Sequence, residues 1–154
     1  MLHGGFIKSF DQTRLYYQVE GAENGPPLVF CYGLVCSKLH WSYQIEHLRQ
    51  NYKLIWFDYR GHFRSELPSD LSSLTIENLS RDILTILDEL DIPKVTLLGH
   101  SMGVNLALET FRLAPERVSG LILANGTARG PLGNIFGSNV LQILFPGLFY
   151  FYEK

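Results

Sequence analysis

A serine stands between two glycines in the stretch GHSMG, residues 99–103. The apolar run KVTLL precedes it, and MGVNLALETF, a sequence typical of a helix, begins inside it. A strand that turns at once into a helix holds the central serine in a strained conformation, with its hydroxyl above the sheet. Gly99 and Gly103 suit this turn because a side chain there would meet the neighbouring strand or helix. We expect Ser101 to be a nucleophile rather than part of a glycine-rich turn without chemistry.

A serine hydroxyl attacks a carbonyl carbon efficiently only when an adjacent base takes its proton and a third group orients that base. No histidine follows Ser101, and the acids that do are Glu109, Glu116 and Glu153. Besides His62, which lies in the stretch after the fourth strand, the histidines that precede it are His3, His40, His47 and His100. None is a convincing base, since His100 adjoins the serine on the turn and the others belong to the first strand and helix.

The elements that would position the serine alternate along the chain. A hairpin is predicted over residues 4–21, followed by buried strands over 28–33, 52–61 and 94–99 and a fourth strand over 117–126. Helices are predicted over 37–51, 76–90 and 102–114, with Ser37 and Thr75 as N-caps of the first two. This order predicts an α/β fold, with a mostly parallel sheet, an N-terminal antiparallel hairpin and helices on both faces. Ligands bind beyond the carboxyl ends of such strands, where the serine turn lies.

Composition narrows the function classes. The chain has 154 residues, of which 46% are hydrophobic and 18% charged, as in a packed globular protein. A net charge of -2 without a basic block argues against nucleic acid as a partner. No secretory signal or transmembrane run is evident, so a cytoplasmic location is expected. Cys31 and Cys36 are interpreted as reduced thiols, because two cysteines make no disulfide framework and no zinc spacing follows.

Three motifs together resemble the α/β-hydrolase family, over about residues 6–130. Besides GHSMG, the stretch VFCYGLVCSKLHW is similar to the family's loop after the third strand, and WFDYRGHFRS to the stretch after the fourth. Tyr32 replaces the family's usual histidine, which predicts altered loop packing or an altered hydrogen bond near the oxyanion site. Phe63 replaces a usual glycine, which predicts a bulkier bend without catalytic consequence.

The resemblance implies roles for particular residues. The backbone N–H groups of Leu34 and Met102 would form the oxyanion hole. Asp58, Arg60 and His62 would support the loop after the fourth strand. No cofactor and no metal is implied. In the family the acid and the histidine follow the serine, some members placing the acid after the next strand, where this chain has Asn125.

The missing base and acid bear on domain organisation. Residues 1–130 are interpreted as the N-terminal part of an α/β-hydrolase core that is C-terminally incomplete. The apolar, aromatic residues 131–154 are interpreted as the start of a helical cap, with a membrane-associating helix as the alternative. The chain is then either the front part of a longer hydrolase or a shortened, inactive descendant.

We expect a serine hydrolase that cleaves a small or medium carboxylic ester through an acyl-enzyme on Ser101, with a small-molecule ester or acyl substrate as its partner. The resemblance argues against epoxide hydrolases and dehalogenases, which attack with an aspartate in this family. Thioesterases, amidases, perhydrolases and carbon–carbon hydrolases remain open. The alternative is a catalytically inactive ligand-binding or signalling module that keeps the pocket. Substrate identity and oligomeric state do not follow from the sequence.

Overall fold

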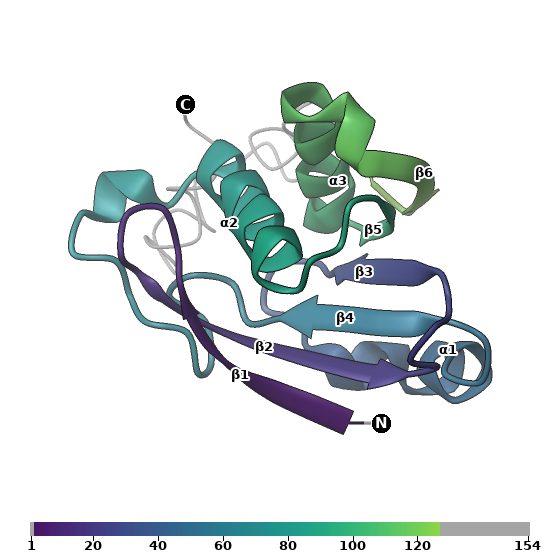
Figure 1. Cartoon of the computed structure of the whole chain (residues 1–154). Helices are drawn as coiled ribbons and strands as arrows, with labels where there is room; N and C mark the ends of the chain where they lie inside the picture. Colours follow the sequence, from purple (N-terminus) through teal and green to yellow (C-terminus); the bar gives the residue numbers. More distant parts are fainter. Residues whose placement is uncertain (1, 127–154) are drawn as a thin grey trace.

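A computed structural model describes residues 2–126, which form one six-stranded sheet in the order β1-β2-β4-β3-β5-β6 with helices packed on it (Figure 1). The strands are β1 (Leu2–Lys8), β2 (Arg14–Gly21), β3 (Pro27–Cys31), β4 (Lys53–Phe57), β5 (Val95–His100) and β6 (Val118–Ala124). The α-helices are α1 (Ser42–Leu48), α2 (Ile76–Glu89) and α3 (Met102–Leu113), and the 3-10 turns are η1 (Lys38–Trp41), η2 (Leu71–Ser73) and η3 (Pro115–Arg117).

The sheet has the mixed pairing that the sequence predicts. Strand β2 pairs antiparallel with both β1 and β4, whereas β4, β3, β5 and β6 run parallel to one another. In the centre Val29 of β3 lies between Ile55 of β4 and Leu97 of β5. The carboxyl ends of the four parallel strands therefore meet at one edge, and the loops that follow them are neighbours.

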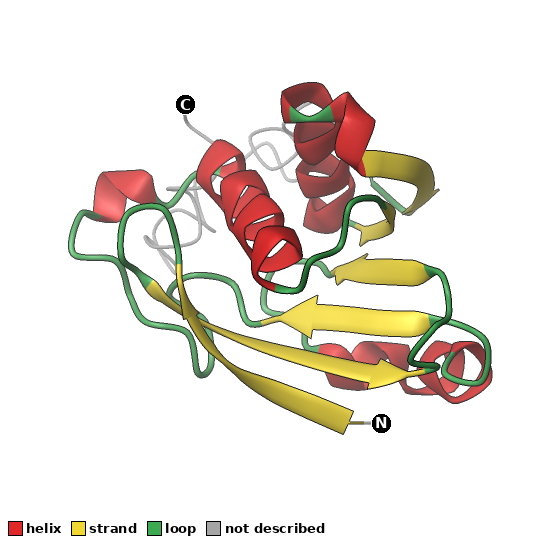
Figure 2. Ribbon diagram, in the orientation of Figure 1, coloured by secondary structure: helices red, strands yellow, loops and turns green. Residues whose placement is uncertain are grey.

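Helices cover both faces of this sheet, as expected. Helices α2 and α3 lie on one face and α1 on the other (Figure 2). The larger core joins α2 and α3 to the sheet through Leu79, Ile83 and Leu106. The smaller core places Ile45 of α1 with Leu54 and other apolar residues of the sheet. None of the helices within residues 2–126 is both long enough and apolar enough to cross a membrane.

Helix α2 confirms the predicted helix over 76–90, and its N-cap is Thr75, whose hydroxyl accepts a hydrogen bond from the Asn78 amide at 3.1 Å. The single helix predicted over 37–51 is wrong in part. Ser37 does cap the segment, but four residues of 3-10 turn precede α1. The Trp41 ring at this break packs edge-on against Phe30 of β3, with ring centroids 5.3 Å apart. Packing onto the sheet thus interrupts the helical pattern.

Strand β6 is the edge strand of the sheet formed by the described residues. Its apolar side chains are partly open to solvent, with Ile122 51% and Leu123 45% exposed. The central strands differ, since Leu28 and Leu97 are almost fully buried. The predicted strand over 117–126 is confirmed, and the exposure of its apolar side chains follows from its place at the edge of the described sheet.

Candidate active site

Ser101 lies exposed at the junction of β5 and α3, with backbone angles φ 56° and ψ -120°. Positive φ is rare outside glycine and costs about 1 to 3 kcal/mol unless the surroundings enforce it. Two hydrogen bonds enforce it here: the Ser101 amide donates to the Ala124 carbonyl at 3.1 Å, and the Val104 amide donates to the Ser101 carbonyl at 3.0 Å. Within residues 2–126 the hydroxyl has no hydrogen-bond partner. The serine backbone is fixed and its Oγ is free.

The two glycines of this turn have steric reasons to be glycine, as predicted. A Cβ on Gly99 would stand 2.5 Å from the Gly103 carbonyl oxygen. A Cβ on Gly103 would overlap the carbonyl group of Cys31 in β3. Both obstacles are backbone atoms, which cannot rotate away as a flexible side chain can. Hydrogen is therefore the only substituent that lets α3 begin this close to β3 and β5.

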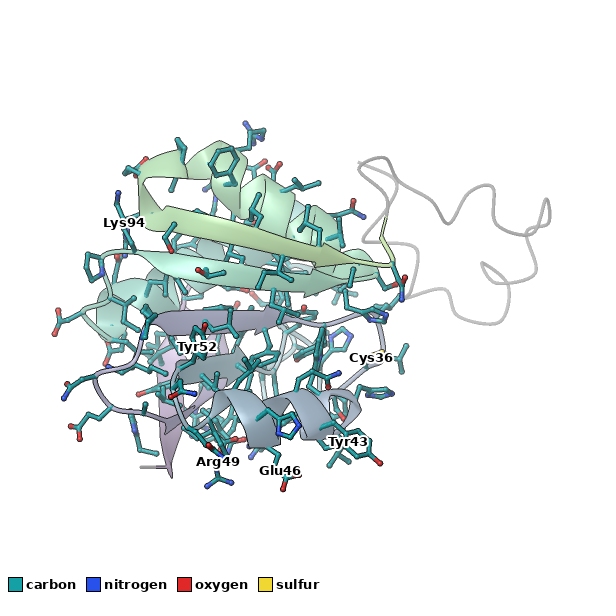
Figure 3. The ribbon with its side chains drawn as sticks, turned by 90° about the vertical axis from the view of Figure 1, so that its right-hand side faces the viewer. Cys36, Tyr43, Glu46, Arg49, Tyr52 and Lys94 are labelled. Carbon is teal, nitrogen blue, oxygen red and sulfur yellow. The ribbon has the colours of Figure 1, made fainter. Side chains whose placement is uncertain are left out.

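The loop after β3 packs directly against the serine. A Cβ placed on Gly33 would lie 3.1 Å from Ser101 Cβ and 3.3 Å from Cys36 Sγ. The Cys36 amide donates to the Gly33 carbonyl at 3.1 Å, which closes a four-residue turn. Val35 adopts φ 61° in this turn, and its side chain is 68% exposed. Leu34 directly follows Gly33 in this turn, and Figure 3 shows Cys36 at the carboxyl end of the sheet, opposite Lys94.

Two backbone amides at this junction have no acceptor. Neither the Leu34 nor the Met102 N–H donates a hydrogen bond to any of the residues that the structure describes. Met102 is the first residue of α3, where amides lack intrahelical acceptors and the helix dipole is positive. Both donors could therefore receive a negatively charged oxygen that forms beside Ser101.

Tyr32 connects two loops through hydrogen bonds and ring stacking, whereas the sequence predicted only altered loop packing or an altered hydrogen bond at this position. Its buried hydroxyl donates to the Phe57 carbonyl at 2.6 Å and accepts from the Tyr59 amide at 3.1 Å. Tyr59 returns the contact, since its hydroxyl donates to the Tyr32 carbonyl at 2.8 Å, and the two rings stack with centroids 4.1 Å apart. This tyrosine pair ties the loop after β3 to the loop after β4. Tyr32 therefore anchors the backbone that leads to Leu34.

The turn after β4 is built around Arg60, whose side chain is fully buried. Its guanidinium makes a bidentate ion pair with buried Asp82 of α2, at 2.6 and 2.8 Å, and donates to Asp11 at 2.8 Å. Ser9 also hydrogen-bonds to Asp82. Burial raises the pKa of the Asp82 carboxyl, and the contacts with Arg60 and Ser9 oppose that rise. Because its donors are occupied by side chains of the core, Arg60 has the supporting role that the sequence predicts.

The rest of this turn is also structural. Asp58 accepts hydrogen bonds from the amide and the Nε of Arg64, at 3.2 and 3.0 Å. Nδ1 of His62 lies 3.2 Å from the Arg60 carbonyl oxygen. Phe63 adopts φ 46°, with its side chain 62% exposed. This is the bulkier bend that the sequence predicts, at a position where positive φ explains why a glycine is usual.

No base for the serine lies among residues 2–126. The His100 ring packs edge-on against Trp41, with centroids 6.0 Å apart, and makes no hydrogen bond to Ser101. His40 is occupied at Ser37, whose amide donates to its Nδ1 at 3.1 Å. Glu109 forms an ion pair with Arg112 at 2.6 Å on the outside of α3. Glu153 and the predicted cap, residues 131–154, lie outside the described residues.

Cys31 and Cys36 are both free thiols, in agreement with their interpretation as reduced. Cys31 is fully buried beneath Gly103, and burial raises the pKa of its thiol. Cys36 is partly exposed beside the serine.

A family model described as alpha/beta hydrolase fold matches residues 26–153. Among curated proteins, 3-oxoadipate enol-lactonase 1 of Acinetobacter baylyi is 32% identical over 128 residues, covering 83% of this chain and 47% of its own length. Epoxide hydrolase 3 of Mus musculus is 29% identical, covering 83% of this chain and 37% of its own length. The chain thus spans less than half the length of these relatives.

Solved structures agree with this match. An esterase from Exiguobacterium antarcticum has a TM-score of 0.74 at 33% identity, covering 82% of this chain and 46% of the esterase. A hydrolase from Pseudomonas aeruginosa PA01 has a TM-score of 0.77 at 29% identity, covering 84% and 48% respectively.

Proposed function

The chain belongs to the α/β-hydrolase family, and from this premise we propose that it is the front part of a serine hydrolase that cleaves a carboxylic ester through an acyl-enzyme on Ser101. The observation that carries the proposal is the exposed Ser101 hydroxyl on a strained turn beside two amides, all three without a hydrogen-bond partner among residues 2–126. The hydroxyl of a serine with only a structural role would form a hydrogen bond, either as a helix cap or with a neighbouring carbonyl. Relatives named as hydrolases support the general class.

The chemistry follows from this arrangement. Oγ of Ser101 bonds to the ester carbonyl carbon while a base outside the described residues takes its proton. The carbonyl oxygen becomes an oxyanion, which accepts hydrogen bonds from the Leu34 and Met102 amides. The bond to the alcohol oxygen then breaks, the alcohol leaves with the proton, and an acyl-serine remains. Water attacks this acyl group in the same way and releases the acid.

The proposal assigns a general base and its orienting acid to residues beyond the chain, since none of the described histidines or carboxylates reaches Ser101. It treats residues 1–130 as the first part of the catalytic core and 131–154 as the start of a cap. A small-molecule ester and a cytoplasmic location belong to the same proposal.

Covalent labelling tests it. The complete protein should react with a biotinylated fluorophosphonate, and peptide mass spectrometry should find the adduct on Ser101. The Ser101→Ala variant should remain unlabelled and should not release acid from an ester. A complete, folded protein that takes up no label would contradict the proposal.

A non-catalytic binding module is the second candidate. Its support is the Tyr32 brace at the position of the usual histidine, together with the absence of a base among residues 2–126. If the complete protein binds acyl compounds in calorimetry but neither labels nor turns over, this candidate replaces the first.

A further inference from the structure

The segment that carries Leu34 is held together locally from Gly33 to Trp41. The turn closed by the Cys36 amide runs directly into Ser37, which caps η1 by accepting from the Leu39 amide while its own amide donates to His40. These bonds make residues 33–41 one semi-rigid unit, called here the oxyanion segment. No residue of η1 is buried. Leu34, Cys36 and Trp41 pack partly buried against the two cores, and contacts made by η1 add to this packing.

Lys38 provides one such contact. Its ammonium lies 2.7 Å from Oε1 of Glu20 on β2 and 3.8 Å from the centre of the Trp56 ring on β4. The Trp56 indole N–H in turn donates to Gln18 of β2 at 3.2 Å. One side chain of η1 thus engages two strands of the sheet through an ion pair and a cation–π contact.

The Glu20 carboxylate is the reason that this ion pair differs from a surface salt bridge. Its side chain is only 9% exposed, and Oε1 accepts no hydrogen bond of good angular geometry from the described residues. Exposed ion pairs contribute little to stability, but a carboxylate this buried needs a nearby cation. Lys38 is the cation in contact with it, so moving Lys38 leaves Glu20 uncompensated. The ion pair therefore holds the start of η1 at its position on the sheet.

Trp41 holds the other end of the segment. Its ring contacts Phe30 of β3 and the His100 ring, which adjoins Ser101. Without the Lys38 contacts the segment would keep the partly buried packing of Leu34, Cys36 and Trp41 but lose its attachment to β2 and β4, so that η1 could shift. Such a movement shifts the Leu34 amide relative to Ser101 without unfolding the sheet. Displacements of about 1 Å at reacting groups can cost about 100-fold in rate.

We infer that Lys38 is a positioning residue, whose ion pair with Glu20 and stacking on Trp56 hold the Leu34 amide in place for the oxyanion. The inference rests on the proposed function. It assigns no contact with substrate to Lys38, and it predicts an effect on the rate of bond formation at Ser101 rather than on substrate binding.

Two measurements on Lys38→Met test it, since methionine keeps much of the stem and removes the charge. In the 154-residue chain, amide hydrogen exchange of peptides covering residues 33–41 should become at least about 10-fold faster, with exchange in α2 and α3 unchanged. In the complete protein, the rate constant for fluorophosphonate labelling of Ser101 should fall at least about 10-fold. For ester substrates kcat should fall while KM stays within about 2-fold.

Lys38→Arg should restore labelling to within about 3-fold of the original rate, because it keeps the charge beside Glu20. Lys94→Met is the matched control, since Lys94 is an exposed lysine at the opposite end of the sheet (Figure 3). Arg117→Met removes hydrogen bonds to the Ile92 and Pro93 carbonyls far from the segment. It should lower the unfolding midpoint without slowing labelling, which separates lost stability from lost positioning.

The outcomes separate the two proposals. If Ser101 of the unaltered complete protein takes no label, the proposed function fails, whatever the exchange experiment shows. If it labels and Lys38→Met labels at the same rate, the positioning role is overturned. It is overturned as well if Lys38→Met slows labelling only as much as an equally destabilising Arg117→Met, or if exchange at 33–41 does not change.

Discussion

The turn after β4 and the turn at residues 99–103 after β5, called here the elbow, lie at the same edge of the sheet. Their polar side chains differ in burial and in hydrogen bonding. In the first, the buried guanidinium of Arg60 is matched by Asp82 and Asp11. In the second, the hydroxyl of Ser101 is exposed on a strained backbone and has no hydrogen-bond partner in the described part of the chain. Burial with complete pairing marks a group that stabilises the fold, because its contacts leave nothing for a ligand. Exposure with strain and free donors marks a group available for chemistry.

The largest expected effect comes from Gly103→Ala in the elbow. The added methyl would overlap the Cys31 carbonyl, so β3 and α3 must separate. We expect the free energy of unfolding to fall by about 4 kcal/mol or more, measured by urea denaturation. Gly5→Ala is the control, because a Cβ there meets nothing closer than 3.9 Å. Equal losses in the two variants would show that the elbow is not tightly packed.

Arg60→Met tests the turn after β4, where the polar groups are buried and paired. It leaves Asp82 buried without its cation, and we expect a loss of about 3 to 5 kcal/mol in the free energy of unfolding. Arg112→Met, which breaks an exposed ion pair on α3, should leave the free energy of unfolding nearly unchanged. Adding Asp82→Asn to Arg60→Met should recover part of the loss. A small effect of Arg60→Met would mean that the turn after β4 does not depend on its buried charges.

Tyr32→Phe probes the connection between the two regions. The change removes one hydroxyl that donates to Phe57 and accepts from Tyr59, and leaves both backbone groups buried. We expect a loss of about 1 to 3 kcal/mol. Tyr43→Phe, at a position 80% exposed, should leave the denaturation midpoint unchanged. If both changes are neutral, the tyrosine pair does not brace the loops.

The smallest effect on stability is expected at the serine itself. Ser101→Gly removes the cost of a side chain at φ 56° and should raise the free energy of unfolding by about 1 kcal/mol. Ser101→Ala keeps that cost and should stay within about 0.5 kcal/mol of the original chain. A clear loss of stability in Ser101→Ala would show that the hydroxyl makes a structural contact, which would remove the contrast between the two turns.

Local patterns account for much of the fold. The apolar runs predicted β3, β5 and β6, the stripe after Thr75 predicted α2, and the glycines around Ser101 predicted a turn whose packing requires hydrogen. The break between η1 and α1 was not predicted, because the local apolar pattern does not show that Trp41 packs against Phe30 of β3. The catalytic roles of Ser101, Leu34 and Met102 stay predictions until labelling tests them.

Partners far apart in the chain could not be predicted. Arg60 was assigned a supporting role, but nothing in the sequence connects it with Asp11 and Asp82. The pairing of Lys38 with Glu20 was not predicted either, because the two residues are far apart in the sequence. A lone lysine on a helix also most often faces solvent. The only local signal would have been a glutamate within a strand that is otherwise half-buried.

The amino-acid sequence by itself determined the order of strands and helices, the elbow and the identity of its serine, because these depend on side-chain periodicity and on steric limits within a few residues. Only the tertiary structure decided which charges are buried, which tyrosines brace the loops and which amides are left without acceptors. These features depend on which segments the sheet brings side by side. Breaking an ion pair is far more destabilising when the pair is buried than when it lies at the surface.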